Sequence, residues 1–329
     1  MPTNKRGIFC ISLDFELHWG CIENKPVMND EAMRYFSNTR KAIPQMLSLF
    51  QQHEMHVTWA IVGMLFNKNA TEWKSNIPKI TPAYSNKGVS TYDWIEKNGF
   101  QEEEDPFHFA PALIEKIKNT PHQEIGTHTY SHYFCLEPGQ TKEQFKADLL
   151  KAIEIASSWG IELTSLVFPR NQFNDDYLSV CRELEITSVR SNPSVWYWSP
   201  ASSSGMLTKI FRTGDAYIKF DRNKSIDLQK LHQHQQPIQL PASRLYRPWK
   251  PSFKFQNKLK LNRILREMTV AAKKGAYYHI WWHPHNFGNH PEQCLQELKI
   301  ILNHFDLLKE KYSFQSMSMN EIANEIALY

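Results

Sequence analysis

The stretch Gly7-Ile8-Phe9-Cys10-Ile11-Ser12-Leu13 decides the fold, because it is an apolar run of strand length that ends directly at Asp14-Phe15-Glu16. A short apolar run of this kind is typical of a strand that is buried on both faces. Side chains alternate along a strand, so Asp14 and Glu16 share a face if the strand continues. Two neighbouring carboxylates disfavour double ionisation unless a cation lies between them. One of the two could bind a metal while the other acts as a base.

The same pattern, a strand-like run followed by a helical stretch, recurs along the chain. Further strand-like runs lie at residues 56–63, 123–127, 164–168, 186–190 and 276–282. Apolar residues at helical spacing lie at residues 39–53, 111–119, 141–156, 175–184, 291–310 and 319–328. Strands that alternate with helices predict βα units and a largely parallel sheet or barrel.

Two stretches interrupt this pattern. Residues 67–105 are polar, contain Pro78, Pro82 and Gly88, and are predicted to be an insertion. Residues 191–255 begin as a loop rich in Ser and Pro and are predicted to be irregular. Neither stretch resembles a linker between domains, so we expect one domain over residues 1–329.

Composition argues against several classes of protein. The chain has 329 residues and a net charge of +4, which does not indicate a nucleic-acid-binding protein. No apolar run approaches the roughly 18–20 residues that a membrane span needs, and the N-terminus has no apolar signal-peptide core, so we expect a cytoplasmic location. The five cysteines are scattered without CxxC spacing, which indicates reduced thiols rather than disulfides or a thiolate metal site.

The segment His128-Thr129-Tyr130-Ser131-His132 follows a predicted strand end and holds two histidines four residues apart. Histidines at this spacing face the same side if the chain turns helically there. Two neutral imidazoles so placed can hold one divalent metal ion. The alternative is a pair of solvated surface histidines, so the pair needs support from the rest of the chain.

Two further polar clusters follow strand-like runs. Arg170 and Gln172 come just after residues 164–168, and His283 comes directly after Trp281 and Trp282. Active sites of barrels and open α/β sheets form at the carboxyl ends of the strands. An arginine there can orient a carboxylate, and a partly desolvated histidine can donate a proton. The alternative is that both clusters are surface loops.

In order and content, these clusters resemble the motifs of the polysaccharide deacetylase family, also called the NodB-homology domain or carbohydrate esterase family 4. The resemblance rests on Ser12-Leu13-Asp14-Phe15-Glu16, Glu124-Ile125-Gly126-Thr127-His128-Thr129-Tyr130-Ser131-His132, Phe168-Pro169-Arg170-Asn171-Gln172 and Ile280-Trp281-Trp282-His283, with Val57-Thr58-Trp59-Ala60-Ile61-Val62-Gly63 as the family's second strand. It spans residues 7–329 and implies an α/β fold: a distorted (β/α)7-type barrel of the NodB-homology kind, with loop insertions.

The chain also departs from the family pattern. The family has two adjacent aspartates, whereas Phe15 here separates Asp14 from Glu16, so the roles of these two carboxylates could be exchanged. The arginine of the third motif comes one place later, and Gln172 replaces an aromatic residue. The fourth motif, Arg190-Ser191-Asn192-Pro193-Ser194-Val195-Trp196-Tyr197-Trp198, lacks the aspartate that supports the acid histidine. Asn286 and Asp215 are the candidates to orient His283 instead.

The resemblance implies a metal-dependent hydrolase that removes an N-acyl group, foremost N-acetyl, from a sugar. Glu16, His128 and His132 would hold one divalent ion, with zinc as the first choice and Co²⁺, Ni²⁺ or Mn²⁺ as alternatives. Asp14 would be the base, aligned by Arg170, and His283 the acid. A backbone N–H near Gln172 would contact the oxyanion. The expected substrate-binding residues are Trp19, Gln172, Trp196, Trp198 and Trp282. Trp281 would join the four tryptophans among them in walling the pocket and stacking on the sugar.

A cytoplasmic location favours a nucleotide-linked or lipid-linked sugar precursor of a surface polysaccharide as substrate. The basic segment Arg244-Leu245-Tyr246-Arg247-Pro248-Trp249-Lys250, continued by Lys254, Lys258, Lys260 and Arg263, could bind a pyrophosphate or an anionic membrane surface. Its alternative is the solvated face of an amphipathic helix. Two other functions use the same residues: a deformylase or another amide hydrolase, and a carbohydrate-binding protein without activity.

Overall fold

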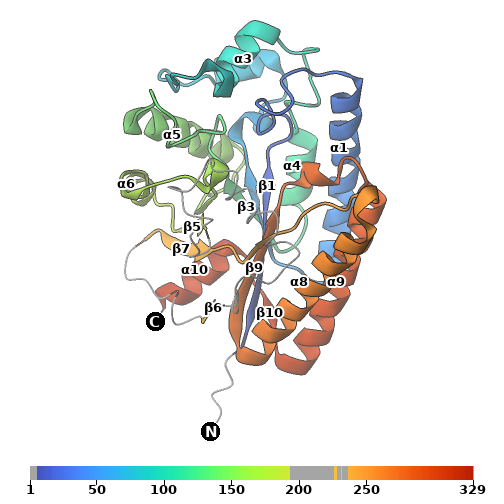
Figure 1. Cartoon of the computed structure of the whole chain (residues 1–329). Helices are drawn as coiled ribbons and strands as arrows, with labels where there is room; N and C mark the ends of the chain where they lie inside the picture. Colours follow the sequence, from blue (N-terminus) through green and yellow to red (C-terminus); the bar gives the residue numbers. More distant parts are fainter. Residues whose placement is uncertain (1–5, 193–225, 228–230, 232–235, 329) are drawn as a thin grey trace.

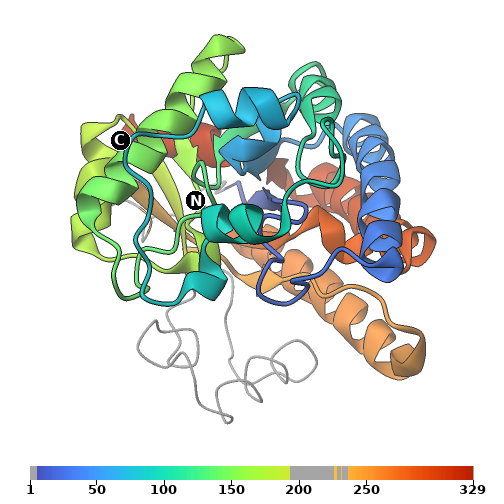
Figure 2. The ribbon, with the colours of Figure 1, turned by 90° about the horizontal axis from the view of Figure 1, so that it is seen from above.

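A curled, largely parallel β-sheet forms the centre of the molecule, and helices surround it (Figures 1 and 2). The computed structural model describes residues 6–192, 226–227, 231 and 236–328. The strands follow the order β6-β9-β1-β2-β3-β4-β5-β7, with β10 beside β1 and β8 beside β9. Of these pairings only that of β6 with β9 is antiparallel in the described part of the chain. The predicted α/β barrel-like fold is therefore confirmed.

The strands lie close to the predicted runs. They are β1 (Ile8–Phe15), β2 (Val57–Ile61), β3 (Gln123–Thr127), β4 (Ser165–Leu166), β5 (Ser188–Ser191), β6 (Ile226–Asp227), β7 (Ile238–Pro241), β8 (Arg244–Leu245), β9 (Ala276–Trp282) and β10 (Gln315–Ser316). The sequence pattern did not predict β6, β7, β8 and β10, because β6, β8 and β10 have only two residues each and β7 lies in the stretch expected to be irregular.

The main helices begin where side chains satisfy their first N–H groups. They are α1 (Asp30–Gln52), α2 (Ala70–Ser75), α3 (Thr91–Asn98), α4 (Pro111–Lys118), α5 (Lys142–Ser158), α6 (Asp175–Glu183), α8 (Lys254–Lys274), α9 (Pro291–Tyr312) and α10 (Met319–Ala327). Asn29 caps α1, which therefore starts well before the predicted residue 39. Thr141 and Gln144 form a capping box at the start of α5. Helices α1, α8 and α9 lie on one side of the molecule, and α5 and α6 on the other (Figure 2).

Alternation along the strands separates two environments. Phe9, Ile11, Leu13 and Phe15 of β1 belong to the main hydrophobic cluster together with residues of the surrounding helices. The intervening positions face the other side of the sheet. There the strands bury many small or polar side chains: Ser12, Asp14, Thr58, Ser165, Ser188, Arg190 and His279. The inner face of the sheet is therefore apolar where the strands begin, around Ile8, Cys10 and Tyr277, and polar towards the carboxyl edge of the strands.

The predicted insertion contains α2 and α3 and packs on the loop that follows β1. The Trp19 indole stacks on the Trp73 indole, with ring centroids 6.5 Å apart. His18 contacts the edge of Trp94, and its Nδ1 lies 2.7 Å from His108 Nε2. The insertion therefore supports the loop directly after Glu16.

Much of the basic segment lies inside the protein. Arg244 and Arg263 both pair with Glu267, at 2.6 and 3.1 Å, and Lys260 pairs with Glu297 at 2.5 Å. The expected solvated or membrane-facing surface therefore does not include these three cations. They fix α8 to its neighbours, because a buried charge requires a partner. No helix in the described ranges is long and apolar enough to cross a membrane.

Candidate active site

The histidine pair lies on an irregular turn that follows β3, not on a helix. Thr129 and His132 adopt left-handed backbone conformations, with φ of 65° and 58°. Asp148 of α5 holds this turn: its carboxylate accepts the backbone N–H groups of Tyr130 and Ser131 at 2.7 and 3.1 Å. The two imidazoles still face the same side, as expected, but the reason is this hydrogen-bonded turn.

The donor atoms of Glu16, His128 and His132 converge. Glu16 Oε2 lies 3.1 Å from His132 Nε2 and 3.3 Å from His128 Nε2. His128 Nδ1 donates to the Val167 carbonyl at 2.7 Å, which leaves Nε2 bare and able to bind a metal. Ligands 2.0–2.1 Å from a tetrahedral zinc ion lie about 3.3 Å from one another. The three residues therefore fit one divalent ion by donor type and spacing.

Burial and charge set the protonation of this triad. Burial alone would raise the pKa of Glu16, but the neighbouring His283, His128 and His132 hold that pKa well below its usual value. Burial also lowers the pKa of His132. An ionised carboxylate beside neutral imidazoles is the form that binds a metal.

Asp14 is paired with Arg190 of β5. The guanidinium donates two hydrogen bonds to the carboxylate, Nη1 to Oδ1 at 2.6 Å and Nη2 to Oδ2 at 2.7 Å. Burial would raise the pKa of Asp14, but Arg190, together with His128 and His283, outweighs burial and lowers it. Asn171 Oδ1 accepts from Arg190 Nε at 3.0 Å, and the guanidinium lies 4.0 Å from the centre of the Trp281 ring. Asp14 is therefore held ionised and in one orientation.

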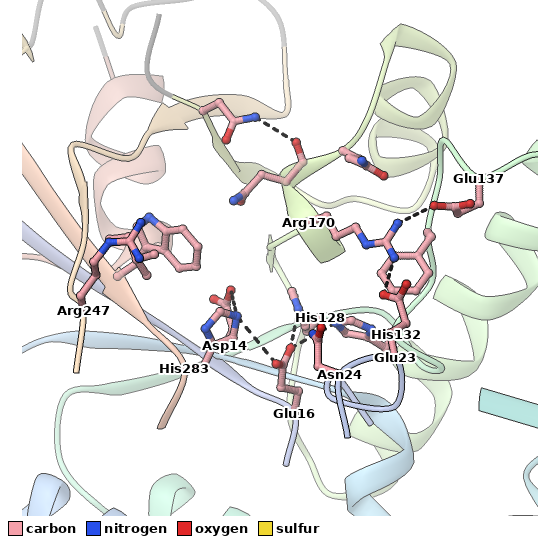
Figure 3. Close-up of a pocket in the computed structure, with 17 residues that line it drawn as sticks. Asp14, Glu16, Glu23, Asn24, His128, His132, Glu137, Arg170, Arg247 and His283 are labelled. Carbon is pink, nitrogen blue, oxygen red and sulfur yellow. Dashed lines mark hydrogen bonds and ion pairs between the residues drawn. The ribbon is translucent and has the colours of Figure 1, made fainter. Parts of the chain in front are cut away.

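Arg170 does not make the expected pair with Asp14. Its guanidinium instead joins Glu23 and Glu137 at the rim of the pocket (Figure 3) and lies 3.9 Å from the centre of the Phe134 ring. The sequence did contain a signal for Arg190: a charged residue in the predicted buried run 186–190 is unusual. We missed it because the arginine was sought in the third motif.

His283 faces both carboxylates. Its Nε2 lies 3.6 Å from Asp14 Oδ2 and 3.7 Å from Glu16 Oε1. His283 and Asn286 form a capping box, in which the side chain of each accepts from the backbone N–H of the other. Asn286, one of the two candidates to orient His283, therefore lies against it, and the His285 ring stacks on the His283 ring. The other candidate, Asp215, lies outside the described ranges.

These residues line one cavity of about 580 Å³ (Figure 3). The lining includes seven residues that the sequence singled out: Asp14, Glu16, His128, His132, Arg170, Gln172 and His283. Trp281 and Arg247 of the basic segment also line it, together with residues that were not predicted as site residues: Gly20, Glu23, Asn24, Phe134, Glu137, Asn171, Asn192 and Leu245. No residue of the insertion lines it.

Residues 30–189 match a family sequence profile described as polysaccharide deacetylase. Through this region the chain belongs to the polysaccharide deacetylase family. This confirms the family predicted from the motifs, and it identifies the chain as a hydrolase of the carbohydrate N-deacetylase class.

Solved structures support the same fold. A candidate polysaccharide deacetylase of Mycobacterium smegmatis is 12% identical, with a TM-score of 0.60 over 100% of this chain and 92% of the other. A candidate polysaccharide deacetylase of Pseudomonas aeruginosa PAO1 is 12% identical, with a TM-score of 0.53 over 98% and 92%. PuuE allantoinase is 12% identical, with a TM-score of 0.54 over 98% and 91%. The search of curated proteins found no match.

Of the described tryptophans that we expected to wall the pocket of this deacetylase-family chain, Trp281 lines it, whereas Trp19 and Trp282 do not. Trp282 packs on Tyr246 and Phe287 in the core, and Trp19 stacks within the insertion. Alternation along β9 explains this result, since it turns Trp281 rather than Trp282 towards the cavity. Trp196 and Trp198 lie outside the described residues.

Gln172 lines the pocket with its side chain, but its backbone N–H is not free for an oxyanion. That N–H donates to the Pro169 carbonyl at 3.2 Å. The side-chain Oε1 is buried and has no partner in the described structure. A buried acceptor without a partner is unfavourable, so Oε1 is placed to accept a hydrogen bond from a ligand.

A second group holds the other oxygen of Glu16. His285 Nδ1 lies 3.5 Å from Glu16 Oε1, and Cys21 Sγ lies 3.7 Å from His285 Nε2. Burial lowers the pKa of His285 to about 3, so the imidazole is neutral. The sequence analysis missed this contact, although His285 follows His283 by two positions.

Proposed function

We propose that this chain is a metal-dependent deacetylase that hydrolyses the N-acetyl group of an N-acetylated sugar. The observation that carries the proposal is the convergence of Glu16, His128 and His132 beside Asp14 and His283 in one cavity. The first three offer a carboxylate and two imidazole nitrogens, as in metal sites of hydrolases. The other two supply a base and an acid for amide hydrolysis.

The roles of the residues follow from their positions. A divalent ion held by Glu16, His128 and His132 would lower the pKa of water and polarise the acyl carbonyl. Asp14 accepts the proton of the water that attacks the carbonyl carbon, and Arg190 keeps that carboxylate aligned. His283 Nε2 donates a proton to the leaving nitrogen as the C–N bond breaks. The products are acetate and a free amino sugar.

Gln172 and the rim residues recognise the sugar. The unpartnered Gln172 Oε1 accepts a hydroxyl or amide N–H of the substrate. The rim carries Asn24, Asn192 and the Glu23–Arg170–Glu137 cluster, which suits a hydroxyl-rich ligand.

The proposed substrate is a nucleotide-linked or lipid-linked sugar that is made in a reducing compartment such as the cytoplasm. All five cysteines are free and buried, which supports a reducing compartment.

We further propose that the chain contacts an anionic membrane at the start of α8. Lys250, Lys254 and Lys258 are exposed there, and Phe255 is 70% exposed. We also propose that residues 1–329 act as one catalytic domain.

The test is acid release from N-acetylated sugars by zinc-loaded protein, with acetate, formate and ammonia measured separately. We expect acetate from the wild type and a loss of at least about a hundredfold in kcat for Asp14→Asn, since general bases contribute about 10²–10⁴. His128→Ala should lose bound zinc as well. His53→Ala, a histidine paired with Asp306 away from the pocket, is the control.

Wild-type turnover by Asp14→Asn would disprove the base assignment. Formate or ammonia in place of acetate would establish the related amide hydrolases instead. A protein with no zinc affinity and no product would establish a binding protein without activity.

A further inference from the structure

A chain of polar side chains lies directly behind the Asp14–Arg190 pair, on the inner face of the sheet. Arg190 Nη1 lies 3.1 Å from Ser12 Oγ, and Ser12 Oγ lies 2.8 Å from His279 Nε2. On the other side of the same imidazole, Nδ1 lies 2.7 Å from the hydroxyl oxygen of Tyr277. Ser12, His279 and Tyr277 are all 0% exposed. The chain therefore lies entirely out of contact with solvent.

Two neighbouring strands build this arrangement. Ser12 is two residues before Asp14 on β1, so both side chains turn to the same face. His279 lies on β9, which pairs in parallel with β1, and Cys10 is its partner in the register. The imidazole thus reaches Ser12 across the strand pair. A histidine in the middle of a fully buried strand is unfavourable unless its nitrogens are hydrogen-bonded.

The direction of the hydrogen bonds follows from the donors available. A guanidinium only donates, so Ser12 Oγ accepts from Arg190. The Ser12 oxygen has a second lone pair, but the hydroxyl hydrogen has no acceptor other than His279 Nε2 among the hydrogen bonds of the described residues. This hydrogen therefore points to Nε2, which is then the bare nitrogen. The proton of the neutral imidazole therefore sits on Nδ1 and is donated to the oxygen of Tyr277. Burial lowers the pKa of His279 to about 3, which keeps the ring neutral.

This direction matters for the guanidinium. Asp14 binds both Nη atoms of Arg190 and Asn171 binds its Nε, while Trp281 lies against its face. Ser12 accepts a further hydrogen of Nη1, while His279 takes the hydrogen of Ser12 and so fixes the orientation of the hydroxyl group. Without the imidazole acceptor, either Ser12 or Arg190 would bury an unpaired hydrogen.

We propose that His279 is a positioning residue, which through Ser12 fixes the Arg190 guanidinium and thereby aims the Asp14 carboxylate at its substrate. The proposal rests on the proposed function, in which Asp14 is the base. His279 itself touches neither the substrate nor the metal ligands. A base displaced by about 1 Å can lose about a hundredfold in rate, so a group behind the pair can control turnover.

The test compares His279→Leu with His279→Gln in zinc-loaded protein. Leucine removes the acceptor for Ser12, whereas the amide oxygen of glutamine can replace it. We expect kcat to fall at least about tenfold in the leucine variant, with KM changed less than about twofold and zinc content unchanged. The glutamine variant should recover most of this loss.

A matched control is His304→Leu. His304 Nε2 lies 2.8 Å from Thr269 Oγ1, the same distance as in the Ser12–His279 contact, but on helices outside the pocket. We expect wild-type kcat in this variant. Wild-type kcat in His279→Leu would overturn the proposal, and so would equal losses in the leucine and glutamine variants.

Nitrogen NMR of the imidazole gives a readout that does not depend on folding of a variant or on the sugar. We expect His279 to carry its proton on Nδ1 in the wild type; a proton on Nε2 would overturn the proposal.

Hydrolysis of an aryl acetate separates the positioning role of His279 from the proposed function. If N-acetylated sugars release no acid but the aryl ester is cleaved, the proposed function fails while the kcat ratio of His279→Leu still decides the positioning role. If neither substrate is cleaved, the NMR result decides it.

Discussion

At the residue scale, Gly20 is required by the space that Glu16 occupies. A Cβ atom at position 20 would lie 2.0 Å from Glu16 Cδ, a distance at which the carboxylate must move. We predict that Gly20→Ala lowers zinc affinity about tenfold or more, since disturbing the support of a ligand typically costs 10–100-fold. The measurement is zinc retention against a chelator. Gly88→Ala is the control, because its Cβ would meet only the Asn86 Oδ1 atom at 3.2 Å. Equal retention in both variants would contradict the prediction.

The two arginines differ in what their loss leaves behind. Arg190→Met leaves the buried Asp14 carboxylate without a partner, and we predict that it lowers the free energy of unfolding by about 3–5 kcal/mol. Arg170→Met breaks ion pairs at the partly exposed rim and should cost about 0–1 kcal/mol. Urea unfolding measures both. A similar loss in the two variants would show that burial does not distinguish them.

The Asp14–Arg190 pair also makes stability depend on pH. The folded pKa of Asp14 is lower than its unfolded value, so the pair stabilises the protein above the unfolded pKa near 4. This stabilisation is lost as the pH falls through the folded pKa. We therefore predict that Arg190→Met flattens the acid side of the stability curve below about pH 4. An acid limb as steep as that of the wild type would contradict this.

The sequence was sufficient to predict which residues surround the candidate metal site, but not which of them contact one another. Asp14 lies near the end of β1, and Glu16, His128, His132 and His283 follow strands; the fold brings these strand ends together. The partner of Asp14 depends on which strands are neighbours in space and on side-chain direction. Short-range pattern does not contain this information, so Arg170 was chosen where Arg190 lies.

At the element scale, α5 acts on the histidine turn through one side chain. Asp148 accepts the N–H groups of Tyr130 and Ser131, between the two histidines. We predict that Asp148→Ala weakens zinc binding and lowers the free energy of unfolding by about 1–3 kcal/mol for each N–H left buried without a partner. Chemical unfolding and zinc titration measure the two effects.

Two control variants accompany Asp148→Ala. Asp148→Asn keeps an oxygen that can accept from the same N–H groups, so it should retain most of the stability. Glu154→Ala on the same helix removes an exposed carboxylate that pairs with Lys151, and it should change neither quantity. If Asp148→Ala behaved like Glu154→Ala, the role of Asp148 in holding the histidine turn would be refuted.

The longer elements were the predictable ones. Strand β9 was predicted with its observed bounds, and α5 within two residues of its observed end, because each has a clear local pattern. The pairing of β10 with β1 could not be predicted, since two residues carry no periodicity. The helical turn expected at the histidine pair was wrong because Asp148, which is distant in sequence, sets the conformation there.

At the scale of the whole molecule, the parallel sheet explains why the basic start of α8 lies near the pocket. Helix α8 precedes β9 and runs back along the sheet, so its first turn lies at the carboxyl edge of the strands, where the pocket opens. Arg247, in the segment before α8, lines the pocket. A lipid-linked sugar could therefore reach the pocket while its carrier stays in a membrane that contacts α8.

Local chemistry at this helix start is unfavourable for a helix in water. The first turn has no acidic residue and no side-chain cap, although acids and caps stabilise helix N-termini. Lys254 and Lys258 lie there instead, and the Phe253 and Phe255 side chains are 39% and 70% exposed. Exposed cations beside exposed aromatic rings match an anionic membrane surface, which attracts the charges and buries the rings.

We therefore predict salt-sensitive co-sedimentation with vesicles that contain anionic phospholipid, and none with neutral vesicles. Because each lysine near such a surface contributes about 1 kcal/mol, reversing Lys254 and Lys258 to Glu should weaken binding at least about tenfold. Reversing Lys273 and Lys274, exposed at the other end of the same helix, makes the same change in net charge and should have little effect. Equal losses in the two double variants would show that only the net charge of the protein matters, not the position of the lysines. Binding that does not change with salt would contradict the proposed contact with an anionic membrane.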